Sequence, residues 1–137
     1  IEHAEYCENY YGTPREYVEK QLEAGKDVIL EIEIQGALKV KEKFPNTLLL
    51  FVMPPNAAEL ERRLRGRGTE DDEVIRKRMH RAQEEAEGIE KYDFIVVNDD
   101  LERCVSQMHS MISAAHYAPG RNKEFIDEIR KELKSWS

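Results

Sequence analysis

Apolar residues follow one another in short runs at three places along the chain, and these runs predict β-strands. Residues 47–53 (TLLLFVM) and 93–97 (DFIVV) are almost wholly apolar, and residues 27–33 (DVILEIE) carry three successive apolar residues before a charged end. Strands that are apolar on both sides are typical of parallel sheets covered by helices on both faces. We therefore predict three strands over these ranges, with 47–53 buried on both faces and ended by Pro54-Pro55.

Between these runs, apolar residues return every three or four positions, as they do on one face of a helix. Thr13-Pro14-Arg15-Glu16 predicts a helix start, with Thr13 as N-cap, and Ala24-Gly25-Lys26 predicts its end. Four further helices are predicted from apolar positions at Ala57, Leu60 and Leu64; at Val74, Ile75, Met79, Ala82 and Ala86; at Leu101, Val105, Met108, Ile112 and Ala115; and, more weakly, at Phe125, Ile129 and Leu133. Strands that alternate with helices indicate the α/β class, with a parallel sheet covered by helices.

The charge balance narrows the range of partners. The 137 residues amount to one domain, and the net charge of −7 argues against a general nucleic-acid-binding protein, which needs a basic surface. A few clustered arginines can still bind a small phosphorylated ligand. Cys7 and Cys104 lie far apart, which favours two reduced thiols in a cytoplasmic protein, and no apolar run reaches the length of a membrane helix.

An arginine-rich stretch is the most unusual part of the sequence. Residues 62–81 contain seven arginines interrupted by an acidic run. Arg63 and Arg67 share one helix face if the helix continues that far, the glycines on either side of Arg67 permit a hinge, and Arg78 lies on the next helix. Arginines on a hinged flap suit phosphoryl transfer, whose transition state spreads negative charge over several oxygens. The alternative is a solvated helical hairpin braced by Arg–Glu pairs.

The opening residues offer chemistry suited to a guanine nucleotide. A carboxylate such as Glu2 can accept both donors of guanine's Watson–Crick edge, a hydroxyl such as that of Thr13 can donate to O6, and the Tyr11 hydroxyl can hold a phosphate. Taken alone, these residues are equally typical of a strand or loop with surface carboxylates and packed aromatic rings.

Polar residues also follow two of the predicted strands. Glu31 and Glu33 end the first, and Asn98 follows the third, at the sheet edge where open α/β proteins bind ligands. The plainer interpretation is that a strand leaves the core through polar residues.

Four segments occur in the order and approximate spacing of guanylate kinases: NYYGT at 9–13, EIEIQG at 31–36, RLRGRGT at 63–69 and IVVNDD at 95–100. From residue 1 to about 115, the chain therefore resembles this family of P-loop nucleoside monophosphate kinases. The resemblance implies an enzyme that transfers a phosphoryl group from ATP to GMP, using Mg²⁺ with the ATP. It also implies an α/β fold in which residues 1–25 belong to a GMP-binding part, 26–62 to the core, 63–80 to a lid, and 81–137 to the core and C-terminal helices.

The resemblance also implies roles for individual residues. Glu2 and Thr13 are similar to the pair that reads guanine, Tyr11 to a ligand of the GMP phosphate, and Glu33 to a further GMP contact where relatives often carry aspartate. Glu31 occupies another acidic position of the active site, and Asn98 is placed to touch the adenine of ATP. Arg63, Arg67 and Arg78 resemble the arginines that clamp the phosphates.

One motif of the family is not found in these 137 residues. They contain no Gly-x-x-x-x-Gly-Lys-Ser/Thr sequence, the loop that cradles the phosphates of ATP. We expect that about the first third of the enzyme is not in this chain and that the chain is inactive by itself. The alternatives are a non-catalytic guanylate-kinase-like module that binds partner proteins and an unrelated α/β domain, the latter disfavoured because four motifs would have to coincide in order.

Overall fold

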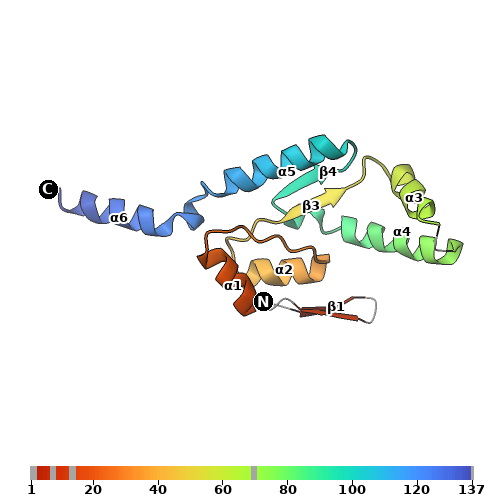
Figure 1. Cartoon of the computed structure of the whole chain (residues 1–137), viewed down its shortest axis with the longest axis horizontal. Helices are drawn as coiled ribbons and strands as arrows, with labels where there is room; N and C mark the ends of the chain where they lie inside the picture. The colour runs from red at the N-terminus through yellow and green to blue at the C-terminus, as the bar shows by residue number, and fades with distance from the viewer. Residues whose placement is uncertain (1–2, 7–8, 13–14, 69–70, 137) are drawn as a thin grey trace. The chain divides into compact units, whose positions relative to one another are not determined.

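The computed structural model describes residues 3–6, 9–12, 15–68 and 71–136 (Figure 1). The chain divides into two compact units, Ile1–Leu49 and Leu50–Ser137, which are described here one after the other. The first contains strands β1 (His3–Tyr6) and β2 (Asn9–Gly12) and helices α1 (Arg15–Glu23) and α2 (Ile34–Lys43). β1 and β2 form an antiparallel pair in which His3 lies opposite Gly12 and Tyr6 opposite Asn9.

Helix α1 ends where the sequence predicts. Gly25 adopts a φ of +81°, a left-handed conformation that glycine takes without steric cost. Its N–H bonds to the Leu22 carbonyl at 3.0 Å, and the Lys26 N–H bonds to the Gln21 carbonyl at 3.1 Å, so two carbonyls of the last turn are satisfied. The predicted helix start at Thr13-Pro14 lies outside the described residues.

The predicted strand over residues 27–33 is wrong. These residues form no regular element, and the next element is α2, a helix that the sequence analysis did not predict. A strand persists only while a neighbouring strand satisfies its backbone, and no described strand pairs with this segment. α2 is stabilised instead by its cap at Glu33 and by the burial of Ala37 and Val40.

The second unit is built on a two-stranded parallel sheet. β3 (Leu50–Met53) pairs with β4 (Phe94–Val97) in the register Leu50↔Phe94 to Met53↔Val97, and the Asn98 N–H extends the ladder to the Met53 carbonyl at 2.7 Å. Val96 is fully buried, and Phe51 meets Tyr92 edge to face with ring centroids 5.0 Å apart. The parallel pairing and the alternation with helices confirm the α/β class.

The helices of this unit are α3 (Ala57–Gly66), α4 (Asp72–Ala86), α5 (Leu101–Ala115) and α6 (Lys123–Lys134), with short 3₁₀ turns η1 (Ile89–Lys91) and η2 (Pro119–Arg121). α5 packs against β4, and α3 packs against α4. The helix predictions from apolar spacing are confirmed for all four.

Burial differs from the prediction in two places. The sheet is not covered on both faces in the described part of the chain, since Val52 and Ile95 are 49% and 51% exposed. On α5, Cys104 is the buried residue, whereas Leu101 and Val105 of the predicted apolar face are exposed. The apolar spacing of a helix predicts which residues share a face, but how deeply they are buried depends on the elements that pack against that face. Parts of the β3–β4 sheet and of α5 remain exposed in the described chain.

Candidate functional site

The seven arginines of residues 62–81 lie on the hairpin of α3 and α4. Asn56 caps α3 by accepting a bond from the Glu59 N–H, and Asp71 caps α4 by accepting one from the Val74 N–H. Leu64 and Ile75 are the buried residues of the two helices. Caps at the helix starts and one buried apolar residue in each helix thus stabilise the hairpin, and its exposed arginines are Arg62, Arg65, Arg67, Arg76 and Arg78.

The end of α3 keeps Arg63 and Arg67 on nearly one face. Arg67 is the C-cap, with helical dihedrals of φ −69° and ψ −21°. Gly68 then adopts a φ of +67°, and its N–H bonds to the Arg65 carbonyl at 3.1 Å. The left-handed residue turns the chain directly after Arg67, at the position where the sequence predicts a hinge.

Glu59 binds two of the arginines. Its carboxylate accepts bonds from Arg62 Nε at 2.9 Å and Nη2 at 2.5 Å, and from Arg63 Nε at 3.0 Å. The hydrogen bonds from Arg62, with its charge and the bond from Arg63 adding to them, lower the pKa of Glu59 to about 2. Glu59 was not singled out from the sequence, although its spacing of three and four from the two arginines is the signal for such pairs.

A second ion pair links the two helices across the turn. Arg65 Nη1 bonds to the Asp72 carboxylate, and its Nε lies 3.5 Å from Glu61. The bond from Arg65 and its positive charge lower the pKa of Asp72. Further along α4, Arg81 Nε pairs with Glu85 at 3.1 Å. The braced-hairpin interpretation is therefore correct for Arg62, Arg65 and Arg81.

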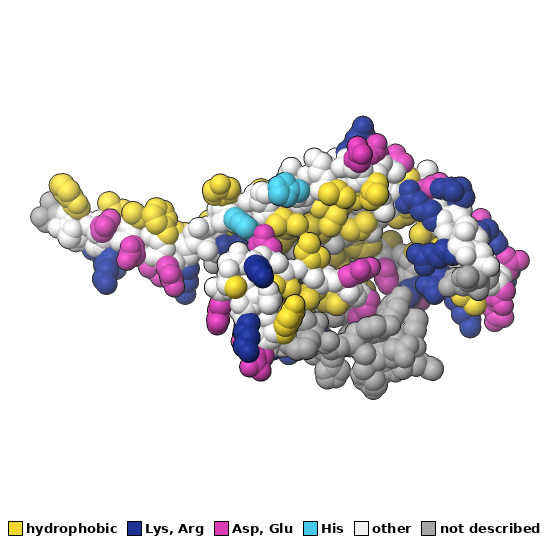
Figure 2. All heavy atoms as spheres, in the orientation of Figure 1, with side chains coloured by type: hydrophobic (Ala, Val, Ile, Leu, Met, Phe, Trp, Pro, Cys, Tyr) yellow, Lys and Arg dark blue, Asp and Glu magenta, His cyan; other side chains and the backbone are white. Residues whose placement is uncertain are grey.

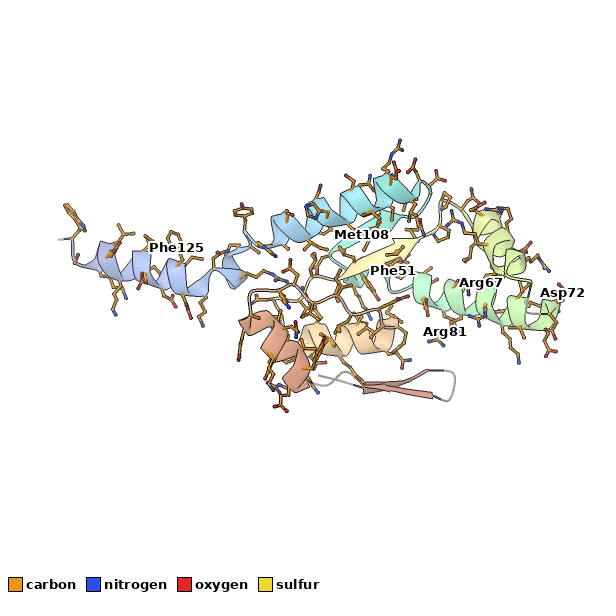
Figure 3. All side chains as sticks on the ribbon, viewed as in Figure 1. Phe51, Arg67, Asp72, Arg81, Met108 and Phe125 are labelled. Carbon is orange, nitrogen blue, oxygen red and sulfur yellow. The ribbon has the colours of Figure 1, made fainter. Side chains whose placement is uncertain are left out.

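Arg67 differs from these braced residues. It is exposed, and it forms no ion pair with any residue that the structure describes (Figure 3). Arg78 is also exposed, on α4, while Arg63 is only 33% exposed and is held by Glu59 through Nε. The hairpin therefore combines arginines held by ion pairs with Arg67, whose guanidinium has no ion-pair partner among the residues that the structure describes.

The carboxyl ends of β3 and β4 meet at Asn98, because the last bond of the ladder is donated by its backbone. Beyond it, Asp100 caps α5 by accepting a bond from the Arg103 N–H at 3.1 Å. A hollow of about 550 Å³ opens between β4 and α5, lined by Ile95, Val97, Asp99, Asp100, Arg103, Ser106, Gln107, Ser110 and Met111. Asn98 itself is half-buried and does not line this hollow.

The remaining predicted residues belong to the first unit. Glu33 is half-buried, and its carboxylate accepts the N–H groups of Gln35 at 2.9 Å and Gly36 at 2.8 Å, which makes it the N-cap of α2. Glu31 is exposed. The backbone of Tyr11 pairs with Ala4 in the hairpin, while Glu2 and Thr13 lie outside the described residues. The site is thus described in two parts, one in each unit.

A family model described as guanylate kinase matches residues 1–115. The chain belongs to the guanylate kinase family. Among its relatives, the guanylate kinase of Halalkalibacterium halodurans is 53% identical over 116 residues, which cover 85% of this chain and 57% of that protein. The guanylate kinase of Caldanaerobacter subterraneus is 48% identical over 132 residues, which cover 96% of this chain and 64% of that protein.

The fold is that of a guanylate kinase as well. The crystal structure of guanylate kinase from Anaplasma phagocytophilum superposes with a TM-score of 0.72 at 32% identity, covering 88% of this chain and 58% of that one. The chain thus spans about three fifths of the length of the relatives it matches. The P-loop nucleoside monophosphate kinase-like fold expected from the resemblance is confirmed.

Two other kinds of site are not found among the described residues. Within residues 3–6, 9–12, 15–68 and 71–136, no helix combines the length and apolar character needed to cross a bilayer. The same residues contain no group of three or more His, Cys, Asp or Glu side chains arranged to hold a metal ion.

Proposed function

We propose that the protein containing this chain is a guanylate kinase that transfers the γ-phosphoryl group of ATP to GMP, giving ADP and GDP. The observation that carries the proposal is the family match over residues 1–115, which includes the arginine-bearing α3–α4 hairpin. The relatives named above are guanylate kinases, which favours the enzyme over a non-catalytic protein-binding module.

The hairpin arginines act on the transferring phosphoryl group. Arg67 brings a guanidinium that has no ion pair with a described residue beside a glycine hinge, so it can approach the phosphates when the hairpin moves. Arg63 presents its terminal nitrogens while Glu59 holds its Nε, and Arg78 adds positive charge from α4. These groups stabilise charge on the equatorial oxygens, which is most of what a protein contributes to phosphoryl transfer.

The opening segment binds GMP. Glu2 accepts from guanine N1–H and N2–H₂, Thr13 donates to O6, and Tyr11 holds the phosphate. Glu33 contacts GMP only in addition to its capping role, because its two oxygens already accept backbone bonds from Gln35 and Gly36. Glu31 provides a second acidic group.

Binding of ATP requires a phosphate-binding loop in addition to the residues named above. Asn98 contacts adenine, and Mg²⁺ bound with ATP would neutralise part of the charge of the phosphates beside the hairpin arginines. The 137 residues contain no phosphate-cradling loop, so the chain alone is inactive because nothing holds the β- and γ-phosphates in line. The reaction belongs to purine nucleotide metabolism in the cytoplasm.

The test joins this chain to the segment that precedes the matched region in the Halalkalibacterium halodurans enzyme. ADP release is followed with ATP, Mg²⁺ and GMP. We expect turnover by the joined protein, none by the 137-residue chain and little with AMP. A joined protein that unfolds cooperatively and binds ATP, yet releases no ADP with GMP, would contradict the proposal and favour the protein-binding module.

A further inference from the structure

Glu59 holds two arginines of the α3–α4 hairpin at the same time. Its Oε2 accepts a bond from Arg62 Nε at 2.9 Å and its Oε1 accepts one from Arg62 Nη2 at 2.5 Å. Oε1 also accepts a bond from Arg63 Nε at 3.0 Å. The side chains of Glu59 and Arg63 are 24% and 33% exposed, whereas that of Arg62 is 71% exposed. The contact with Arg63 is therefore the more shielded of the two, and solvent weakens it less.

The start of α3 fixes the backbone of Glu59. Its N–H donates to the side chain of Asn56 at 2.8 Å, which is the N-cap bond of the helix. Arg63 follows four residues later, and a carboxylate four residues before a basic residue is the favourable order for a pair on a helix. The pair thus lies in the regular part of α3, whereas Arg67 lies directly before the left-handed Gly68.

The bond to Nε decides which edge of the Arg63 guanidinium is presented. A guanidinium is a rigid planar fork with one N–H on Nε and four on the two terminal nitrogens. Glu59 takes the N–H of Nε, and no other partner of the Arg63 side chain is found among the residues that the structure describes. The plane of the fork is therefore held, and both terminal nitrogens are left for a two-point contact with a phosphoryl group.

Holding Arg63 in this way does not cancel the positive charge of the hairpin. The bonds from Arg62, with its charge and the bond from Arg63 adding to them, lower the pKa of Glu59 to about 2, so the carboxylate is charged at neutral pH. One carboxylate is shared by two arginines, so this cluster of three side chains stays positive. Figure 2 shows Lys and Arg side chains (dark blue) gathered over α3 and α4.

We propose that Glu59 is a positioning residue for phosphoryl transfer, which holds Arg63 through Nε so that its terminal nitrogens meet the transferring phosphoryl group. The inference rests on the function proposed above for the α3–α4 hairpin. Glu59 touches neither nucleotide and acts only through Arg63. Arg63 is set in place before the nucleotides bind, whereas Arg67 arrives by movement at the hinge. Because a charge that is already in place costs no reorganisation during the reaction, holding Arg63 raises kcat more than it raises binding.

The test compares alanine variants of the joined, active protein. Glu59→Ala removes the acceptor of Arg63, and Glu61→Ala is the matched control, since it makes the same change on α3 but removes a pair with Arg65. Glu59→Ala should lower kcat about tenfold and change KM for GMP and ATP less than about twofold, because a misplaced group costs rate rather than affinity. Glu61→Ala should lower kcat less than about twofold, and Arg62→Ala, which leaves the contact between Glu59 and Arg63, less than about threefold. Urea unfolding checks that every variant is folded.

A double-mutant cycle separates positioning from a general effect on the fold. Arg63→Ala alone should lower kcat by about 100-fold. Adding Glu59→Ala should then lower kcat less than about twofold further, because Glu59 no longer has Arg63 to position. The cycle is clean, since Arg62 still binds both oxygens of Glu59 in the Arg63→Ala variant and no carboxylate is left unpaired. Losses that multiply would show that Glu59 acts on the fold and would overturn the proposal.

Failure of this inference differs from failure of the proposed function. A joined protein that folds and binds ATP but releases no ADP with GMP contradicts the proposed function, and the positioning role falls with it. An active joined protein in which Glu59→Ala keeps kcat within about twofold overturns the role of Glu59 alone. An active joined protein in which Arg63→Ala has no effect on kcat does the same, because Glu59 would then have no catalytic group to position.

Discussion

Val96 and Val52 form a matched pair for testing the core of the second unit. They are direct partners in the β3–β4 ladder, yet Val96 is 0% exposed and Val52 is 49% exposed. Replacing either by alanine removes the same two methyl groups. At about 0.8 kcal/mol per buried CH₂, the transfer term for Val96→Ala is roughly 1.6 kcal/mol. The cavity left behind adds to it, so we expect a total of about 2–3 kcal/mol. Val52→Ala should cost less than about 1 kcal/mol, because half of that side chain is already in water.

Urea unfolding followed by far-UV circular dichroism measures both losses. With a urea dependence of about 1–3 kcal/mol/M for a small domain, Val96→Ala should lower the unfolding midpoint by roughly 1–2 M. Val52→Ala should lower it by less than half of that. Equal losses from the two variants, or a negligible loss from Val96→Ala, would mean that β4 does not form the centre of this unit as the structure has it.

Three further predictions concern single carboxylates. Glu33→Ala should destabilise the chain to unfolding by about 1 kcal/mol through loss of the α2 cap, and an unchanged melting temperature would show that the cap contributes nothing. The carboxyl resonance of Glu59 should titrate near its pKa of about 2 rather than 4.5. Because this pKa is lowered on folding, the ion pairs of Glu59 stabilise the folded state above pH 4.5, and this stabilisation is lost as the pH falls towards 2. A titration midpoint near 4.5 for the Glu59 carboxyl would show that the bonds from Arg62 and Arg63 do not persist in solution. In the joined protein, Glu2→Gln should lower kcat/KM for GMP by roughly 10- to 1,000-fold and leave AMP nearly unaffected, whereas an unchanged ratio of the two nucleotides would remove Glu2 from the guanine site.

Local patterns were sufficient to predict most helices and two of the strands. α3, α4 and α5 each follow a cap residue with an apolar stripe behind it, and both signals lie within a few residues of one another. The Gly25 cap of α1 is local in the same way. The four motifs were likewise sufficient to predict the family, because each is a contiguous stretch of sequence.

The failures concern properties that depend on distant neighbours. Residues 27–33 have a strand-like composition, but a strand also needs a hydrogen-bonding partner, which no local pattern specifies. Val52 is as apolar as Val96, and only the packing around them decides which is buried. Arg–Glu pairs were an open alternative for the hairpin, but several carboxylates lie at pairing distance from each arginine along the sequence, and only the structure shows that Glu59 holds Arg62 and Arg63.

Arg67 and Arg62 provide the most direct test of whether the α3–α4 hairpin acts on phosphate. Both are exposed arginines at the hairpin, but Arg62 is tied to Glu59 by two bonds, and Arg67 has no ion pair with a described residue. The measurement is kcat and the GMP dissociation constant of Arg67→Ala and Arg62→Ala in the joined, active protein. Arg67→Ala should lower kcat by about 100-fold or more with little change in GMP binding, as should Arg78→Ala, because their charge matters most in the transition state. Arg62→Ala should lose less than about threefold, as expected for a residue that only braces the helix. Losses below about threefold for both Arg67→Ala and Arg78→Ala would show that the hairpin is a solvated, salt-bridged surface and not a phosphate clamp.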